Sequence, residues 1–333
     1  MVSVSAYNET SLRQAASIIQ RGGVVGGVVA FPTETVYGLG ADAFNPRAVA
    51  RVFEIKRRPQ FDPLIVHIAR KSDLENLVQG VTPLASKLVE AFWPGPLTLV
   101  LPKRDIIPGI VTSGLPSVAI RMPAHPVALR LIELCERPLA APSANLFGHV
   151  SPTRAEHVQE QLGEKVDLIL DGGPCNVGVE STIVSLTPGD QPEVLRLGGV
   201  TIEEIEQIAG QVRIRDPEEG PALAPGMLSR HYSPRTPLKI LDNYGEIPSY
   251  EGRRIGLLAF KSPPDRSCYH AVEVLSESGD LREAAANLFA ALHRLDAAGL
   301  DLILAEPVPQ TGIGLAIMDR LKRASGSFGG EEG

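Results

Sequence analysis

Apolar residues at positions 1–211 occur in two patterns, at helical spacing and in short runs. Residues 9–20 place apolar side chains at helical spacing, which predicts an amphipathic helix with one buried face. Short apolar runs predict strands at 28–31, 64–68, 97–101, 118–122, 138–141, 166–170, 183–186 and 194–197. Strands that alternate with helices indicate an α/β domain with a mixed, twisted sheet over residues 1–211.

Capping residues mark where helices begin. Asn45 before Pro46 predicts a helix start, with an N-cap side chain followed by proline at the first helical position. Two further helices are predicted by capping-box pairs, Thr153 with Glu156 and Thr201 with Glu204.

The pattern breaks at residues 212–237, where prolines at 217, 221, 225, 234 and 237 disfavour helices and strand ladders. This composition predicts a linker. Beyond it, apolar runs at 238–241, 255–260 and 302–305 predict strands, and 281–298 predicts an amphipathic helix between Asp280 and Gly299. We therefore expect a second, small Rossmann-like α/β domain at 238–333.

Charge, hydropathy and cysteine content disfavour several classes of protein. The net charge of −7 and pI near 5.6 argue against a large non-specific nucleic-acid surface. No apolar run approaches twenty residues, and the N-terminus lacks a signal-peptide pattern, so no membrane span is expected. Cys135, Cys175 and Cys268 are far apart and lack metal-site spacing, which favours a reducing cytoplasm.

Residues 31–67 carry the densest candidate chemistry. Gly38 and Gly40 predict a tight turn after a hydroxyl-rich stretch. Pro59 disfavours helix at Arg58, so an extended segment would place Lys56 and Arg58 on one face as a phosphate clamp. A solvated basic loop is the alternative, but its position between the hydroxyl turn and a buried strand favours a site for an anionic ligand.

Eight motifs occur in one order along the chain. They are PTETVYGLG (32–40), KRRP with DPL (56–64), WPGPLTLVL (93–101), VAIRMP (118–123), PSAN (142–145), GVESTIV (178–184), LRLGGV (195–200) and PGMLSRHYSP (225–234). With this ordered set the chain resembles the threonylcarbamoyl-AMP synthase family, in the long form with a YrdC-like catalytic domain and a C-terminal domain.

The resemblance implies a reaction. L-Threonine, bicarbonate and ATP give threonylcarbamoyl-AMP and pyrophosphate, and a tRNA threonylcarbamoyl transferase then uses the product to modify tRNA. Mg²⁺ is expected with ATP, with no organic cofactor and no metal held by the protein alone. Contact with tRNA is expected to be weak or transient, and the location cytoplasmic.

The resemblance also assigns site residues. Arg121 stands in an otherwise apolar strand, where a guanidinium needs an anion, and a structural ion pair is the alternative. The threonine pocket is expected to contain Thr35, His67, Arg121 and Ser181. The ATP site is expected to contain Lys56, Arg58, Asp62, Ser117, Ala141, Ser143, Asn145, Ser151, Arg196 and Tyr232. Lys56 and Arg58 are expected to position substrate without a covalent role, and Glu180 is a candidate Mg²⁺ ligand or pocket-shaping residue.

Asp62 stands where the family usually has asparagine or lysine, and a carboxylate beside a triphosphate is unfavourable unless Mg²⁺ intervenes. His231 and Tyr232 lie in the proline-rich segment 221–237, which the resemblance implies is a lid over the nucleotide.

Two other classes of protein are compatible with the sequence. A YrdC-like domain also suits an RNA-binding module, which the acidic net charge disfavours. A carbamoyl-transfer enzyme is the second alternative, but such proteins carry zinc-finger-like modules and the chain has no paired CxxC. No GxxxxGK[ST] or GxGxxG loop is present.

Overall fold

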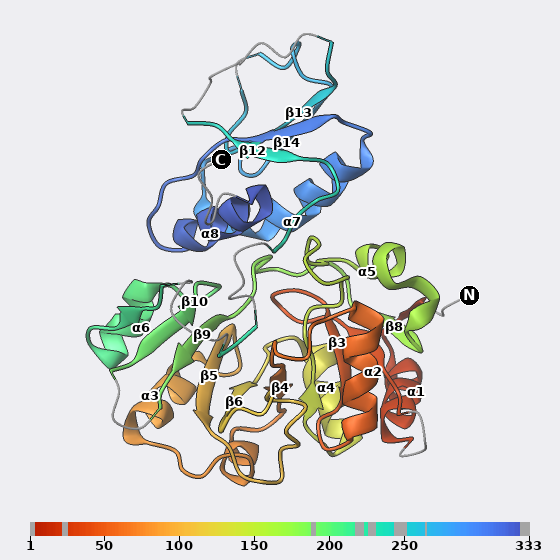
Figure 1. Ribbon diagram of the computed structural model, residues 1–333, viewed down its shortest axis with the longest axis vertical. Helices are drawn as coiled ribbons and strands as arrows, with labels where there is room; N and C mark the ends of the chain where they lie inside the picture. The colour runs from red at the N-terminus through yellow and green to blue at the C-terminus, as the bar shows by residue number, and fades with distance from the viewer. Residues whose placement is uncertain are drawn as a thin grey trace. The chain divides into compact units, whose positions relative to one another are not determined.

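The computed structural model describes residues 4–21, 26–187, 191–216, 223–225, 231–242, 252–263 and 265–326. The chain divides into two compact units (Figure 1). The first contains 1–147, 152–176 and 180–228, and the second contains 148–151, 177–179 and 229–333.

The described strands of the first unit form one mixed sheet of eleven strands. Their order is β1-β8-β2-β3-β7-β4-β6-β5-β9-β10-β11. The strands are β1 (Val4–Ala6), β2 (Val29–Phe31), β3 (Gly38–Asp42), β4 (Ile65–His67), β5 (Leu97–Pro102), β6 (Ser117–Arg121), β7 (Leu139–Ala140), β8 (Leu168–Asp171), β9 (Thr182–Ser185), β10 (Glu193–Arg196) and β11 (Arg213–Ile214). Every strand range predicted in this unit overlaps one of them. β11 lies in the segment predicted to be linker and pairs with β10, so the sheet extends further than expected.

Helices cover both faces of this sheet. They are α1 (Glu9–Gln20), α2 (Pro46–Lys56), α3 (Pro83–Phe92), α4 (Pro126–Cys135), α5 (Ala155–Leu162) and α6 (Ile202–Ala209), with 3₁₀ turns η1 (Lys71–Asn76) and η2 (Gly163–Lys165). Alternate residues of a strand point to opposite faces. Accordingly, Val29 and Phe31 of β2 pack into the core that contains α1 and α4, and Ala30 packs into the core that contains α2.

Most predicted caps are present. The side chain of Asn45 accepts from the backbone of α2, and Thr201 with Glu204 forms a capping box on α6. The predicted capping box at Thr153 is wrong. Helix α5 begins two residues later, after Arg154, and the backbone N–H of Thr153 donates to Nδ1 of His157 at 3.3 Å.

The predicted turn at Gly38 and Gly40 is also wrong, because both glycines lie within β3. Their role is close packing. A Cβ at Gly40 would lie 2.5 Å from the ring of Phe31 on the antiparallel neighbour β2. The two glycines therefore leave room for the Phe31 ring beside β3.

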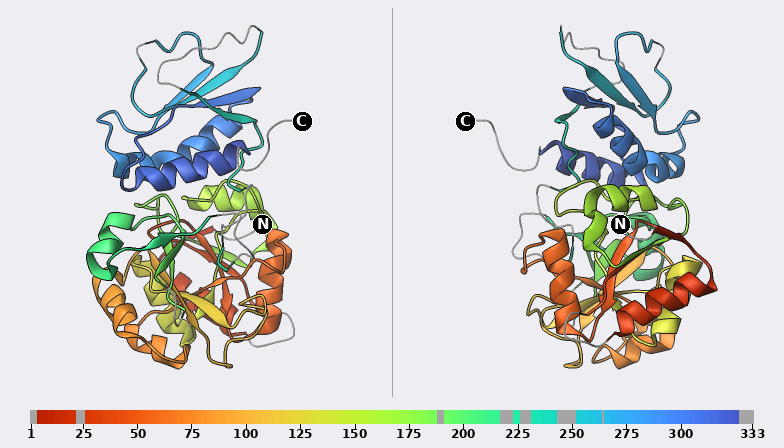
Figure 2. Two further views of the ribbon diagram at one scale, coloured as in Figure 1. Left: turned by 60° about the vertical axis from the view of Figure 1, so that its left-hand side comes forward. Right: turned by 90° about the vertical axis from the view of Figure 1, so that its right-hand side faces the viewer.

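The described strands of the second unit form a four-stranded parallel sheet, in the order β12-β15-β13-β14. Its elements are β12 (Leu238–Ile240), β13 (Ile255–Ala259), β14 (Ala271–Val274), α7 (Leu281–Ala297), β15 (Leu302–Ala305) and α8 (Gly314–Ser325). Figure 2 shows α7 and α8 on one face of the sheet, in contact with each other. The predicted Asp280 cap of α7 is confirmed, and Gly299 follows its end with a φ of +65°.

Among the described residues, none of the helices combines the length and apolarity that a membrane crossing requires.

Candidate functional site

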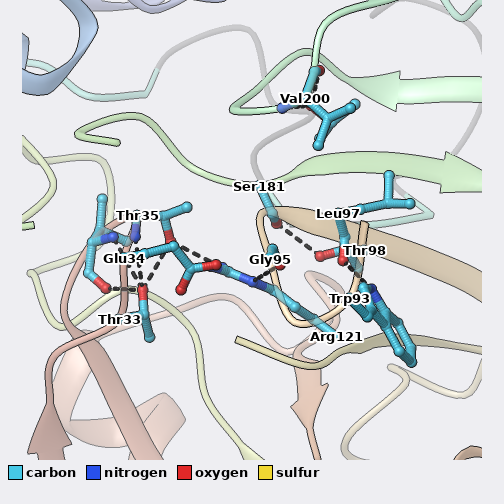
Figure 3. Close-up of polar contacts among 12 residues, drawn as sticks. Thr33, Glu34, Thr35, Trp93, Gly95, Leu97, Thr98, Arg121, Ser181 and Val200 are labelled. Atoms are coloured by element: carbon cyan, nitrogen blue, oxygen red, sulfur yellow. Dashed lines mark hydrogen bonds and ion pairs between the residues drawn. The ribbon is translucent and has the colours of Figure 1, made fainter. Parts of the chain in front are cut away.

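Arg121 lies at the end of β6 and forms the centre of a buried polar cluster (Figure 3). Its Nη2 lies 2.6 Å from Oε1 of Glu34, and its Nη1 donates to Oγ1 of Thr35 at 2.9 Å. Its Nε donates to the carbonyl of Gly95 at 3.2 Å. The Arg121 side chain is only 4% exposed, so its charge depends on these partners and on any bound anion.

The turn after β2 supplies the acceptors. Oγ1 of Thr33 donates to the carbonyl of Val36 at 2.6 Å and lies 2.8 Å from Oγ1 of Thr35. The backbone N–H groups of Thr35 and Val36 both donate to Thr33, so this hydroxyl organises the turn. The turn thereby directs Glu34 and Thr35 towards Arg121, as Figure 3 shows.

His67 lies beside Arg121, because parallel strands β4 and β6 place the two residues in register. Burial, and then the nearby Arg121, lower the pKa of His67 to about 3. The imidazole is therefore neutral near pH 7. Its Nδ1 has no hydrogen-bond partner among the described residues, so a buried polar atom remains for a ligand.

Ser181 joins this cluster from the other side. Its Oγ lies 2.7 Å from Oγ1 of Thr98 on β5 and accepts from Nη2 of Arg196 at 3.0 Å. Arg196 also donates to the carbonyl of Ser181 and, through Nη1, to the carbonyl of Pro225 at 3.0 Å. Arg196 thus links Pro225 of the proline-rich segment to Ser181.

The same segment packs on the sheet. Leu223 and Ala224 join an apolar cluster with Ile65, Val100, Ala119, Ile183 and Leu195. Because these contacts lie within the first unit, residues 223–225 are part of its packed structure.

Lys56 and Arg58 form a second, cationic cluster, but the predicted extended clamp is wrong. Lys56 is the last residue of α2, and Arg57 adopts the left-handed conformation with a φ of 53°. Nζ of Lys56 donates to the carbonyls of Ser143 and Asn145, each at 2.5 Å. Burial, and then Arg58, lower the pKa of Lys56 well below its ordinary value.

Arg58 faces its own loop. Its Nη2 lies 2.8 Å from Oδ2 of Asp62, and it donates to the carbonyls of Asp62 at 3.0 Å and Pro63 at 2.9 Å. The two cations therefore have different partners, because the helix end turns the chain between them.

The remaining predicted ATP residues divide between the two units. In the first, Ser117 begins β6, Ala141 follows β7, and Ser143 and Asn145 hold Lys56. Glu180 is buried, and its charge acts on the pKa of Lys56.

Ser151 and Tyr232 belong to the second unit. The Tyr232 ring is 1% exposed and stacks on Phe289 at 5.5 Å, with Arg320 5.0 Å from its centroid. The carbonyl of Ser151 lies 3.1 Å from Nε2 of His293.

Sequence reasoning missed Thr33, Glu34 and Thr98. The available signal was Glu34, an acid between two threonines just after the apolar strand predicted at 28–31. A buried carboxylate needs a cation, and Arg121 was already the unpaired cation of the predicted core.

Comparison with known proteins agrees with this architecture. The Sua5/YciO/YrdC family model, described as telomere recombination, matches residues 24–198. The model of the threonylcarbamoyl-AMP synthase C-terminal domain matches residues 200–326. The threonylcarbamoyl-AMP synthase of Pyrococcus abyssi is 46% identical over 96% of this chain and 95% of its own length. That of Bacillus subtilis is 45% identical, over 96% and 94%.

A solved structure extends the likeness to three dimensions. The crystal structure of P. abyssi Sua5 complexed with L-threonine matches with a TM-score of 0.88 at 43% identity, covering 98% of this chain and 97% of that one. A double variant of that protein, with a histidine and the adjacent tyrosine replaced by alanine, matches equally well at 42% identity.

The two-unit α/β fold and its full-length relatives define an enzyme of the transferase class that forms an adenylate. The chain belongs to the threonylcarbamoyl-AMP synthase family, and synthesis of threonylcarbamoyl-AMP for tRNA modification is its activity.

Proposed function

We propose that the Arg121 cluster binds L-threonine, with its carboxylate on the guanidinium. The observation that carries this assignment is a buried arginine, 4% exposed, whose neighbours Thr35 and Glu34 hold it in one orientation. A guanidinium binds a carboxylate through charge-assisted hydrogen bonds. The neutral His67 and the Ser181 hydroxyl supply polar atoms for the rest of the amino acid. The threonine-bound P. abyssi structure supports the choice of ligand.

ATP takes the cationic cluster. Lys56, Arg58 and Arg196 are the donors for the triphosphate, since all three are buried cations whose charges act on the same neighbour, Asp62. Asn145 and Ser143 orient Lys56, and Ser117 and Ala141 border the nucleotide. Ser151 and Tyr232, which belong to the second unit, stay predicted nucleotide contacts on the family resemblance.

Mg²⁺ fits this donor set as a companion of ATP. Oδ1 of Asp62 is a buried carboxylate oxygen without a hydrogen-bond partner among the described residues. When bound, the ion neutralises charge on the triphosphate.

The protein acts by positioning and by exclusion of water. Threonine and bicarbonate condense to a carbamate with loss of water. A carboxylate oxygen of the carbamate then attacks the α-phosphate of ATP and displaces pyrophosphate, and no residue needs to form a covalent bond. Leu223 and Ala224 cover apolar side chains of the sheet, which supports a lid function for the proline-rich segment 221–237, of which residues 221–222 and 226–230 lie outside the described residues. The product passes to a tRNA threonylcarbamoyl transferase, with direct tRNA contact weak or transient, in the cytoplasm.

The test is the dependence of ATP turnover on both co-substrates. Pyrophosphate release by the purified protein is expected only when L-threonine and bicarbonate are both present, with threonylcarbamoyl-AMP detected by mass spectrometry. Serine and acetate, added in place of threonine and bicarbonate, are the matched controls. ATP turnover without threonine, at the same rate, would contradict the proposal.

A further inference from the structure

Arg58 and Asp62 form a closed pair within the loop between α2 and β4. The side chains are 3% and 1% exposed, and Nη2 of Arg58 lies 2.8 Å from Oδ2 of Asp62. The same guanidinium donates to the carbonyls of Asp62 and Pro63. Because these acceptors belong to one short loop, Arg58 is held in place before any substrate arrives.

The Asp62 carboxylate depends on that cation. A buried carboxylate costs free energy unless a positive charge compensates it. Burial raises the pKa of Asp62, and Arg58, followed by Lys56 and Arg196, opposes this shift. Oδ1 of Asp62 has no hydrogen-bond partner among the described residues, so the carboxylate retains an unused acceptor.

ATP binding would create a conflict at this pair. The cations that compensate Asp62 are the ones assigned above to the triphosphate. A phosphate that draws Arg58 to itself leaves Asp62 buried, negatively charged and close to a polyanion, which is strongly unfavourable at low dielectric constant. The pocket therefore needs a replacement cation at Asp62 whenever Arg58 turns to phosphate.

A divalent ion can meet that need only together with the nucleotide. The described residues contain no group of three or more His, Cys, Asp or Glu side chains that could hold a metal. Mg²⁺ commonly binds through one or two carboxylates, with phosphate oxygens and water as the other ligands. One carboxylate with a free oxygen beside the phosphate donors matches this arrangement.

We propose that Asp62 makes ATP binding dependent on Mg²⁺. Asp62 holds Arg58 before ATP binds, and becomes the single protein ligand of the Mg²⁺ that accompanies the triphosphate when Arg58 moves to the phosphates. This inference rests on the proposed ATP site. No covalent bond is made or broken, because one ion pair replaces another.

The experiment measures ATP affinity by calorimetry on the full-length protein, with excess Mg²⁺ and with EDTA. For the wild type, Mg²⁺ is expected to tighten ATP binding by at least ~10-fold, equivalent to about 1.4 kcal/mol. In Asp62→Asn the gain is expected to fall to about 3-fold or less, and metal-free ATP should bind more tightly than to the wild type, because the buried negative charge is gone. An unchanged threonine affinity shows that the variant folds.

Asp167→Asn is the matched control, because Asp167 also pairs with an arginine of the first unit, Arg51 at 2.5 Å, outside the pocket. It should keep the wild-type response to Mg²⁺. An Asp62→Asn variant with the wild-type Mg²⁺ gain, or a wild type with no gain, overturns the inference but leaves the proposed ATP site intact. Absence of ATP binding under both conditions overturns both.

A second measurement needs no variant. Mn²⁺ with ATP is added to wild-type protein labelled with ¹³C at aspartate carboxyl groups, and pulsed electron paramagnetic resonance records the coupling. A ¹³C hyperfine coupling from a directly bound carboxylate is expected. Its absence, with ³¹P coupling present, would show that Asp62 does not bind the metal.

Discussion

The guanidinium of Arg121 lies 2.6 Å from the carboxylate of Glu34, and both side chains are almost fully buried. Glu34 and Thr35 hold the guanidinium of Arg121 in one orientation before a substrate binds. A preoriented cation loses little conformational entropy on binding. The pair therefore prepares the site for a carboxylate ligand.

Arg121→Ala is expected to weaken threonine binding about ten- to a hundredfold, because it removes a charge-assisted contact worth about 1.5–3 kcal/mol. Calorimetric titration with L-threonine measures the change. Arg137→Ala is the control, since Arg137 is half exposed and lies 3.7 Å from Asp42. An unchanged threonine dissociation constant in Arg121→Ala would remove Arg121 from the threonine site.

Lys56→Ala and Arg58→Ala are each expected to weaken ATP binding by at least ~10-fold and to change threonine binding far less, because each removes a buried cation from the proposed phosphate cluster. Arg57→Asn is the control in the same loop. Arg57 is exposed, and asparagine tolerates its left-handed backbone. ATP affinity in either alanine variant equal to that of Arg57→Asn would refute the phosphate assignment.

Tyr232→Ala is expected to lower the amount of threonylcarbamoyl-AMP formed per ATP consumed. Its buried ring stacks on Phe289 and lies against Arg320, so its removal detaches the proline-rich segment from α7 and α8 and admits water. Tyr232→Phe keeps the stacked ring and should retain most of the yield, while Tyr7→Ala, at an exposed site, is the control. Equal yields from Tyr232→Ala and wild type would mean that the segment is only a tether.

The lowered pKa of His67 predicts that the folded chain loses stability in acid. Its pKa is about 3 in the folded chain against an ordinary value of 6.5, so protons bind preferentially to the unfolded chain. The stability that the neutral His67 imidazole contributes to the folded chain is fully present above pH 6.5 and is lost as the pH falls from 6.5 towards 3. At pH 5 the loss is about 2 kcal/mol.

Denaturant unfolding of the wild type and His67→Gln at pH 5 and pH 7.5 tests this expectation. The free energy of unfolding should fall less for the variant between the two pH values, because glutamine does not titrate. His270→Gln, at an exposed position, is the control. Identical pH dependence in wild type and His67→Gln would show that the folded histidine titrates normally.

Three helix caps could be predicted because their signals lie within a few residues. Asn45 caps α2, Thr201 with Glu204 caps α6, and Asp280 caps α7, because each cap depends on hydrogen bonds to backbone groups within one turn. The apolar runs located strands for the same reason. The ordered motifs were sufficient to identify the family, and with it the activity, because together they span most of the catalytic unit.

Only the tertiary structure decided which of these residues meet. The β4–β6 register brings His67 beside Arg121, and the turn after β2 delivers Glu34 to the same guanidinium. The left-handed residue Arg57 at the end of α2 separated Lys56 from Arg58, which then paired with Asp62. Strand order, register and buried ion pairs arise from contacts between distant segments, and their free energies depend on burial that no local pattern records.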